Sequence, residues 1–135
     1  MQSNETIITK PDVLINTDTL LQLKTFVQEE SQVVVHCSYT SAGFMDLIRI
    51  WPSTYLIDQG SSHKSELVHV ENVSIAPIWT RLAYGETRVF TLIFSGLPKT
   101  CSVFDFIESI PEPNGFEIRN IQRNVSDVYF VVVNE

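Results

Sequence analysis

The chain has 135 residues, of which 44% are hydrophobic and 19% charged, and its 9 basic and 16 acidic residues give a formal net charge of −7. That length fits one domain with a core of its own, and the content of apolar residues excludes a disordered chain. The negative charge repels phosphate backbones and anionic lipids. We therefore expect neither a nucleic acid nor a membrane among the partners.

The sequence shows no signal for a membrane or for secretion. Residues 1–6 have neither a basic start nor an apolar core, and no apolar run reaches the roughly 18 residues that a membrane-spanning helix needs. We predict a cytoplasmic protein, the alternative being an exported protein whose signal peptide has been removed. Cys37 and Cys101 are expected to be free thiols in the first case, whereas they could pair in the second.

The beginning of the chain is the least regular part. Residues 1–18 are polar apart from a short apolar run at 13–15, which predicts a flexible N-terminal arm or an edge strand. Residues 19–135 are predicted to form a single β-sandwich domain. Its first segment, 19–27, fits the period of a helix or of a strand, and we favour a strand that forms a hairpin with the apolar run 33–39.

The next part alternates apolar runs with breaks. A strand is predicted over 46–51, where Pro52 stops or bends it, and the apolar pattern continues over 53–57. The stretch 58–65 is the most polar of the chain. It predicts an exposed loop that is mobile unless a partner or a metal fixes it.

Two further strands are predicted before residue 95. Residues 66–75 form the first, and a shift of its apolar phase indicates a bulge near Glu71 and Asn72. A turn at 82–86 leads into the second, 88–94, which we expect to be the central strand. Both of its faces are apolar enough to be covered by other parts of the chain. The side chains of its two faces are Phe90, Leu92 and Phe94 on one side, and Val89, Thr91 and Ile93 on the other.

The last third of the chain predicts three more strands, at 103–107, 116–121 and 128–133. The Asn-Gly pair at 114–115 is the strongest hairpin signal in the chain, and the short linker 122–127 predicts that the last two strands are neighbours. No helix of about ten or more residues is indicated. The expected fold is all-β, an antiparallel immunoglobulin-like β-sandwich of about 8 strands.

Two cysteines and a tryptophan invite comparison with the immunoglobulin signature. Cys37 and Trp51 have a plausible separation for a core tryptophan on the strand after the first cysteine. The second half of the signature is missing, because Lys99 stands where a tyrosine is expected before Cys101. The pattern therefore favours the topology and not the disulfide.

Metal-ligating residues occur at one place only. His69 and Glu71 would share one face of a strand, and His63 or Asp58 from the polar loop would complete a three-ligand set. The other interpretation is that His69 and Glu71 form a solvated face and that His63 is a loop residue. No repeated ligand spacing supports the metal site, so we expect no cofactor.

Catalytic patterns are absent from the sequence. Asp105 and Glu108 are both acidic, but their spacing does not decide whether they face the same way. No serine stands in a G-x-S-x-G setting, and no glycine-rich phosphate loop is present. We expect a protein that is not an enzyme.

Aromatic residues gather near two prolines. Trp51, Tyr55, Trp79 and Tyr84 lie close to the breaks at Pro52 and Pro77 in the sequence. They would either form an exposed platform for a sugar or a peptide, or plug the ends of the core.

Several motifs of the chain resemble small bacterial β-sandwich proteins and bacterial immunoglobulin-like accessory domains, over about residues 46–133. These motifs are Trp-Pro-Ser-Thr-Tyr-Leu at 51–56, Phe-Thr-Leu-Ile-Phe-Ser-Gly-Leu-Pro-Lys at 90–99, Phe-Asp-Phe-Ile-Glu at 104–108 and Gly-Phe-Glu-Ile-Arg-Asn-Ile at 115–121. The resemblance implies a fold, and it brings no catalytic residue with it.

Three functions remain open, and they are given in order of preference. The first is a β-sandwich that binds a protein partner or assembles with itself, because the chain is acidic, has many strands and shows no chemical site. The alternative is a module that binds carbohydrate or another small ligand through the aromatic residues. A metal-dependent enzyme is the third.

Overall fold

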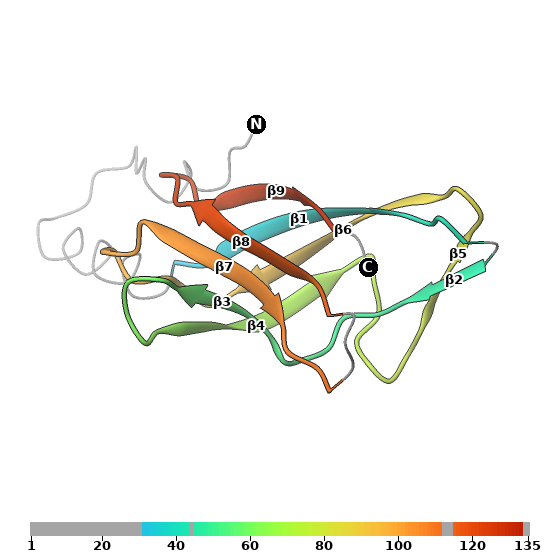
Figure 1. Cartoon of the computed structure of the whole chain (residues 1–135), viewed down its shortest axis with the longest axis horizontal. Helices are drawn as coiled ribbons and strands as arrows, with labels where there is room; N and C mark the ends of the chain where they lie inside the picture. Colours follow the sequence, from blue (N-terminus) through green and yellow to red (C-terminus); the bar gives the residue numbers. More distant parts are fainter. Residues whose placement is uncertain (1–30, 44, 112–114, 134–135) are drawn as a thin grey trace, which may run out of the picture.

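The structure is a computed structural model, and it describes residues 31–43, 45–111 and 115–133. These residues form nine strands and no helix (Figure 1), so no helix among them could cross a bilayer. The predicted arm 1–18, the segment 19–27 and most of the 111–115 turn lie outside the described residues. The strands are β1 (Val33–Thr40), β2 (Met45–Ile48), β3 (Thr54–Asp58), β4 (Lys64–Glu71), β5 (Thr80–Ala83), β6 (Thr87–Phe94), β7 (Val103–Glu108), β8 (Glu117–Gln122) and β9 (Val128–Val132).

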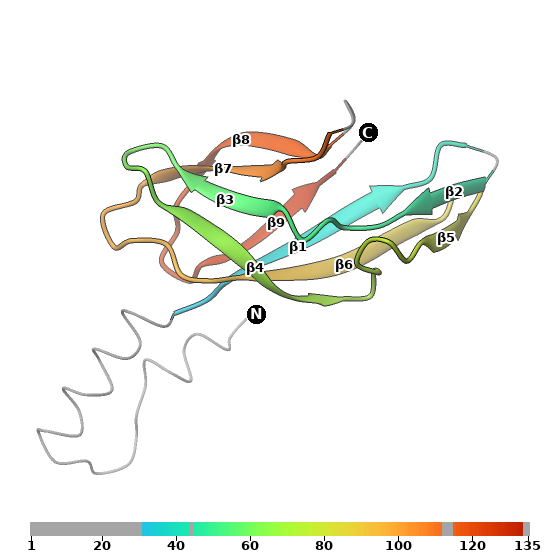
Figure 2. The same cartoon turned by 90° about the horizontal axis from the view of Figure 1, so that it is seen from below.

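Seven strands form one curled sheet, in the order β8-β7-β3-β4-β6-β1-β9. The sheet curls so that β8, β7 and β3 lie over β6, β1 and β9 (Figure 2). Strands β2 and β5 pair with each other in a separate ribbon at one end of the molecule (Figure 1). The predicted all-β, mostly antiparallel class is confirmed. The exception is β9, which runs parallel to β1, since the whole chain between them supplies the long connection that parallel strands need.

Strand β6 lies in the interior of the sheet, with a neighbour on each side as predicted. It pairs with β1 on one side and with β4 on the other, and Leu92 is fully buried on its inner face with Phe90 and Phe94. The outer face differs from the prediction, because it is covered only in part: Thr91 and Ile93 are half-buried. Val89, at the start of that face, is 56% exposed.

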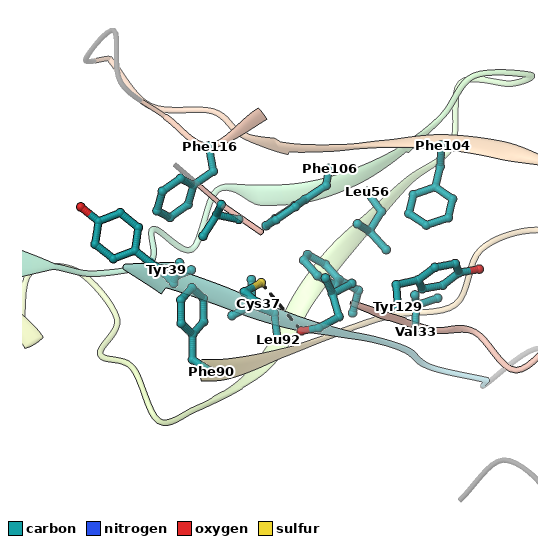
Figure 3. Close-up of a cluster of buried hydrophobic side chains, with 14 of the residues drawn as sticks. Val33, Cys37, Tyr39, Leu56, Phe90, Leu92, Phe104, Phe106, Phe116 and Tyr129 are labelled. Atoms are coloured by element: carbon teal, nitrogen blue, oxygen red, sulfur yellow. Dashed lines mark hydrogen bonds between the residues drawn. The ribbon is translucent and has the colours of Figure 1, made fainter. Parts of the chain in front are cut away.

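The core lies between the two layers of the curled sheet. Figure 3 shows aromatic side chains of β7 pointing toward those of β1, β6 and β9. Phe94 meets Phe106 with ring centroids 6.1 Å apart, and Phe104 meets Tyr129 at 5.1 Å, both edge to face. Such contacts between large buried rings hold the layers together by apolar burial and by favourable ring geometry.

The prediction that the last two strands are neighbours is wrong. Strand β8 pairs with β7 at one edge of the sheet, whereas β9 pairs with β1 at the other. The short linker crosses from one layer to the other instead of making a hairpin. The Arg123 guanidinium fixes this crossing, because it binds the Asp127 carboxylate at 2.5 Å and the carbonyl of Pro98 at 2.7 Å.

Three local predictions in the middle of the chain need correction. The run through 46–57 is divided between the ribbon strand β2 and the sheet strand β3. The strand β5 at Thr80–Ala83 was not predicted. The irregular register of β4 lies between Leu67 and His69, and Asn72, with φ of 68°, instead follows the end of the strand.

The polar loop between β3 and β4 is anchored at both ends. Asp58 and Ser65 are buried, although the sequence predicted an exposed stretch. The Asp58 carboxylate accepts hydrogen bonds from the Gly60 N–H at 2.9 Å and from the Ser61 hydroxyl at 2.6 Å. These hydrogen bonds lower the pKa of Asp58 below its usual range.

Candidate functional site

The predicted aromatic group is only partly assembled. Trp51 and Trp79 both contact the Arg49 guanidinium, whose carbon lies 5.1 Å and 3.7 Å from the two ring centroids. Tyr55 is separate from this group and is covered by the ammonium of Lys64 at 4.2 Å. Tyr84 lies in the exposed turn after β5. The structure therefore places two of the four predicted residues around one arginine.

The predicted metal ligands are not all brought together. His69 and Glu71 form an exposed pair at 3.3 Å on β4, as their spacing predicted. The His63 imidazole instead lies 3.0 Å from the Ser65 hydroxyl and 3.1 Å from the Gly96 carbonyl. Within the part of the chain that the structure describes, no three of His, Cys, Asp and Glu gather as a metal site.

The two acidic residues of β7 serve the fold. The Glu108 carboxylate accepts hydrogen bonds from the backbone N–H groups of Trp51 at 3.0 Å and Phe116 at 3.2 Å. The Asp105 carboxylate accepts from the Asn120 N–H at 2.9 Å and pairs with Arg119 at 3.2 Å. The two carboxylates therefore join β7 to Trp51 and to residues in and before β8.

The protonation of Asp105 follows from the same contacts. Burial by itself would raise the pKa of Asp105, but the hydrogen bonds from Asn120 and Gln59 and the charge of Arg119 outweigh it and lower the pKa. A general acid at neutral pH needs a raised pKa. Asp105 is therefore suited to an ion pair and not to donating a proton.

Both cysteines are free and buried, as expected for a chain without a disulfide. Burial raises the pKa of the Cys37 thiol to about 12 and that of Cys101 to about 11. A nucleophilic cysteine needs a lowered pKa and exposure. These thiols therefore act as small core side chains.

The first exposed surface is the outer face of β6, β1 and β9. Its side chains form three rows across the strands, and we call these nine residues the outer face. The rows are Val89, Ser38 and Val132; Thr91, His36 and Phe130; and Ile93, Val34 and Val128. No residue of the outer face is charged, and Phe130 and Val132 are 70% and 68% exposed.

The outer face is hollowed beside Phe130. An open hollow of about 480 Å³ is lined by residues of β1, β6 and β9, among them Ser38, Val89 and Val132. Phe130 is one of the residues that line the hollow, and its ring meets the His36 ring in a T-shaped contact, at 4.9 Å between ring centroids. The face thus carries a projecting ring next to an apolar depression.

The second exposed surface lies on the ribbon, and we call it the ribbon patch: Leu47, Arg49, Trp51, Trp79 and Arg81. In the register of the ribbon Leu47 is opposite Arg81, and continuing it places Arg49 opposite Trp79. The residues between them, Ile48, Ile50 and Leu82, are buried. Sequence reasoning missed Arg49, although its alternation with two buried isoleucines was the available signal.

Comparisons with known proteins found no relative of this chain. No protein-family model matches the chain, and neither a curated protein nor a solved structure matches it. The outer face and the ribbon patch are therefore judged by their own chemistry.

Proposed function

We propose that this protein is a non-enzymatic binding protein and that it associates with a second copy of itself through the outer face. The observation that carries the proposal is the absence of charge from all nine outer-face residues, with Val89, Phe130 and Val132 more than half exposed. Exposed apolar surface gathered in one place is typical of interaction sites.

The charge of the chain restricts where two copies can meet. Each chain carries −7, so two copies repel each other wherever acidic residues meet. The nine residues of the outer face include no Asp or Glu, so contact through them brings no acidic side chains of the two copies together. Its neighbour β4 supplies the exposed pair His69 and Glu71 beside Ile93 and Thr91, which gives the apolar centre a polar rim.

The shape of the face also suits contact with itself. A twofold axis brings the same surface of both subunits together, so that a projection on one copy must fit a depression on the other. In the proposed dimer the Phe130 ring of each copy enters the hollow over Ser38 of its partner. One polar atom of the face is already satisfied, because His36 Nδ1 lies 2.8 Å from the Thr91 hydroxyl.

An immunoglobulin-like sandwich is the architecture we propose for the curled sheet. Its support is the position of β8, β7 and β3 over β6, β1 and β9, with Phe104 and Tyr129 in contact across the core. In such a sandwich the two inner faces form the core and the two outer faces can contact partners. The proposed dimer forms through one of these outer faces.

Light scattering after size-exclusion chromatography tests the association, over micromolar to sub-millimolar concentrations of the full chain. The wild type should form a dimer, and Phe130→Asp should weaken it by about 100-fold or more, because it buries two unpaired like charges. Val125→Asp is the matched control, since Val125 is fully exposed in the linker after β8. A monomeric wild type, or equal weakening by the control, would overturn the proposal.

The small-ligand alternative has less support from the same surfaces. The Arg49 guanidinium lies 3.7 Å over the Trp79 ring, and one face of that indole is therefore taken by the protein itself. A sugar stacks on a free aromatic face. A glycan array would favour this alternative if it gave a signal that Trp79→Ala abolished.

A further inference from the structure

The ribbon patch has a chemistry that the outer face lacks, because it contains unpaired arginines. The chain has five arginines, and all lie among the described residues. Three of them pair with carboxylates: Arg88 with Glu86, Arg119 with Asp105 and Glu117, and Arg123 with Asp127. Arg49 and Arg81 make no ion pair with a described residue, and both belong to the ribbon patch.

Arg49 is held in place with most of its donors unused. Its Nη1 donates to the Pro77 carbonyl at 3.2 Å, and Trp51 and Trp79 lie against its guanidinium. Its Nε–H is shielded from solvent and has no hydrogen-bond partner among the described residues. A shielded donor without a partner is unusual in a folded protein. A shielded Nε–H is out of the reach of a ligand, so the Nη groups, whose contact with Pro77 is exposed, are the donors that a ligand can meet.

The surroundings of Arg49 prepare it for an anion. Stacking on indole rings restricts the long side chain before any ligand arrives, so that less conformational entropy is lost on binding. A planar guanidinium matches a carboxylate with two parallel hydrogen bonds. Tryptophan and arginine are also the residues that most often dominate binding energy at protein interfaces.

The spacing of the two arginines indicates the form of the ligand. Arg81 is opposite Leu47, so Arg49 and Arg81 are diagonal neighbours on adjacent strands. Diagonal neighbours lie about 7–8 Å apart. Residues two apart in an extended chain are separated by nearly the same length, about 6.8 Å. An extended segment with acidic residues at alternate positions therefore matches the spacing of the two arginines along the ribbon backbone.

We propose that the ribbon patch binds an extended acidic segment of a partner protein, in which two carboxylates two residues apart meet Arg49 and Arg81. An apolar side chain of the segment packs on Trp79, which is half exposed, and on Leu47. The charge of the patch is complementary to such a segment, while the net charge of −7 repels a long polyanion such as a nucleic acid. The ribbon patch and the outer face share no residue, so this inference does not depend on self-association.

Tryptophan fluorescence of the full chain tests this inference directly. The chain has two tryptophans, and both belong to the ribbon patch, so the emission reports on the site itself. The probe is the peptide acetyl-Gly-Glu-Ser-Glu-Ser-Leu-Gly-amide, in which the Leu shares one face of the extended chain with both Glu residues, and the control peptide has Gln in place of both Glu residues. We expect a saturable change with the first peptide and at least about tenfold weaker binding of the second, because charged hydrogen bonds are lost.

Variants assign the effect to the two arginines. Arg49→Gln and Arg81→Gln should each weaken binding of the acidic peptide, and Arg49→Lys should weaken it too, because an ammonium lacks the planar fork. Arg81 is exposed, so its variant keeps the test valid if Arg49→Gln fails to fold. Arg119→Gln, at the far edge of the sheet, is the matched control and should leave binding unchanged.

Several outcomes would overturn the inference. These are no saturable change at millimolar peptide, equal binding of the two peptides, or equal weakening by the Arg119 control. Tighter binding of inorganic phosphate, or a change with a glucose oligosaccharide and not with the peptide, would assign the patch to another ligand. Repeating the titration with Phe130→Asp separates it from self-association, since the peptide should bind this variant as tightly as the wild type.

Discussion

The strands β6 and β2 alternate inward and outward side chains in the same way, but their outward side chains differ in chemistry. Each strand alternates buried and exposed residues, with Leu92 and Ile48 inside. Outside, β6 contributes Val89 to a surface without charge, whereas β2 leads to Arg49, in a patch with two arginines that make no ion pair with a described residue. The core decides the inner half of a strand, and it leaves the outer half free to be apolar in one place and cationic in another.

The difference also separates two kinds of binding. An apolar, charge-free face gains stability by removing surface from water, and it tolerates a copy of itself. A pair of arginines needs an acidic partner and rejects a basic one. One small domain can therefore hold two independent binding surfaces.

The largest expected effect concerns the two faces of β6. Leu92→Ala should lower the free energy of unfolding by about 2 to 5 kcal/mol, because it leaves a cavity in the core. Val89→Ala, three residues earlier on the outer face, should change it by no more than about 0.5 kcal/mol but should weaken the dimer. Urea unfolding measures the stability of the two variants, and light scattering measures the dimer. Equal midpoints would show that the inner and outer faces of β6 are not distinct.

The inner faces of the strands were the part that sequence could predict. Phe90, Leu92 and Phe94 alternate with period two, and burial of one such set is the simplest way to make a core. The sheet order could not be predicted, because it depends on long-range contacts. A linker as short as 122–127 joins β8 to β9 equally well as a hairpin or as a crossing between layers.

The candidate surfaces were predicted only in part, for a similar reason. Trp51 and Trp79 were recognised as aromatic residues near prolines, but their meeting through Arg49 requires the pairing of β2 with β5. The short strand β5 has one buried apolar residue, Leu82, and so gives little periodic signal. Charge on an outer face carries no fold signal at all, since the core does not constrain it.

The next effect contrasts a paired arginine with the unpaired ones. Asp105→Asn removes the carboxylate that Arg119 binds, and it should lower stability by about 1 to 3 kcal/mol at neutral pH. The lowered pKa of Asp105 means that its contribution is present above about pH 4 and is lost as the pH falls through that lowered pKa.

Urea unfolding of wild type and Asp105→Asn at several pH values checks this expectation. The gap between the two proteins should close in acid, because the wild-type carboxyl then becomes protonated as well. A gap of constant size down to the lowest pH would contradict the assigned role. Arg81→Gln should leave stability unchanged throughout, because Arg81 has no ion partner among the described residues to lose.

Salt should separate the two surfaces by a smaller, several-fold effect. Raising the salt from about 0.1 M to about 1 M shortens the screening length from about 10 Å to about 3 Å. Binding of the acidic peptide to the ribbon patch should weaken several-fold, whereas dimerisation through the outer face should not weaken, because salt also screens the repulsion between two copies of charge −7. Fluorescence titration and light scattering measure the two. Parallel weakening of both would show that the outer face also depends on charge.

The smallest effect is expected in the polar loop, which belongs to neither surface. Ser62 is exposed and makes no hydrogen bond with a described residue, so Ser62→Ala should change stability by less than about 0.5 kcal/mol. Ser65 is buried and donates to the Gly96 carbonyl at 3.0 Å, so Ser65→Ala should lower stability by about 1 kcal/mol. Neither variant should alter peptide binding or dimerisation. A Ser62→Ala change that weakened either would place a third contact in this loop and would mean that the two surfaces do not account for the binding.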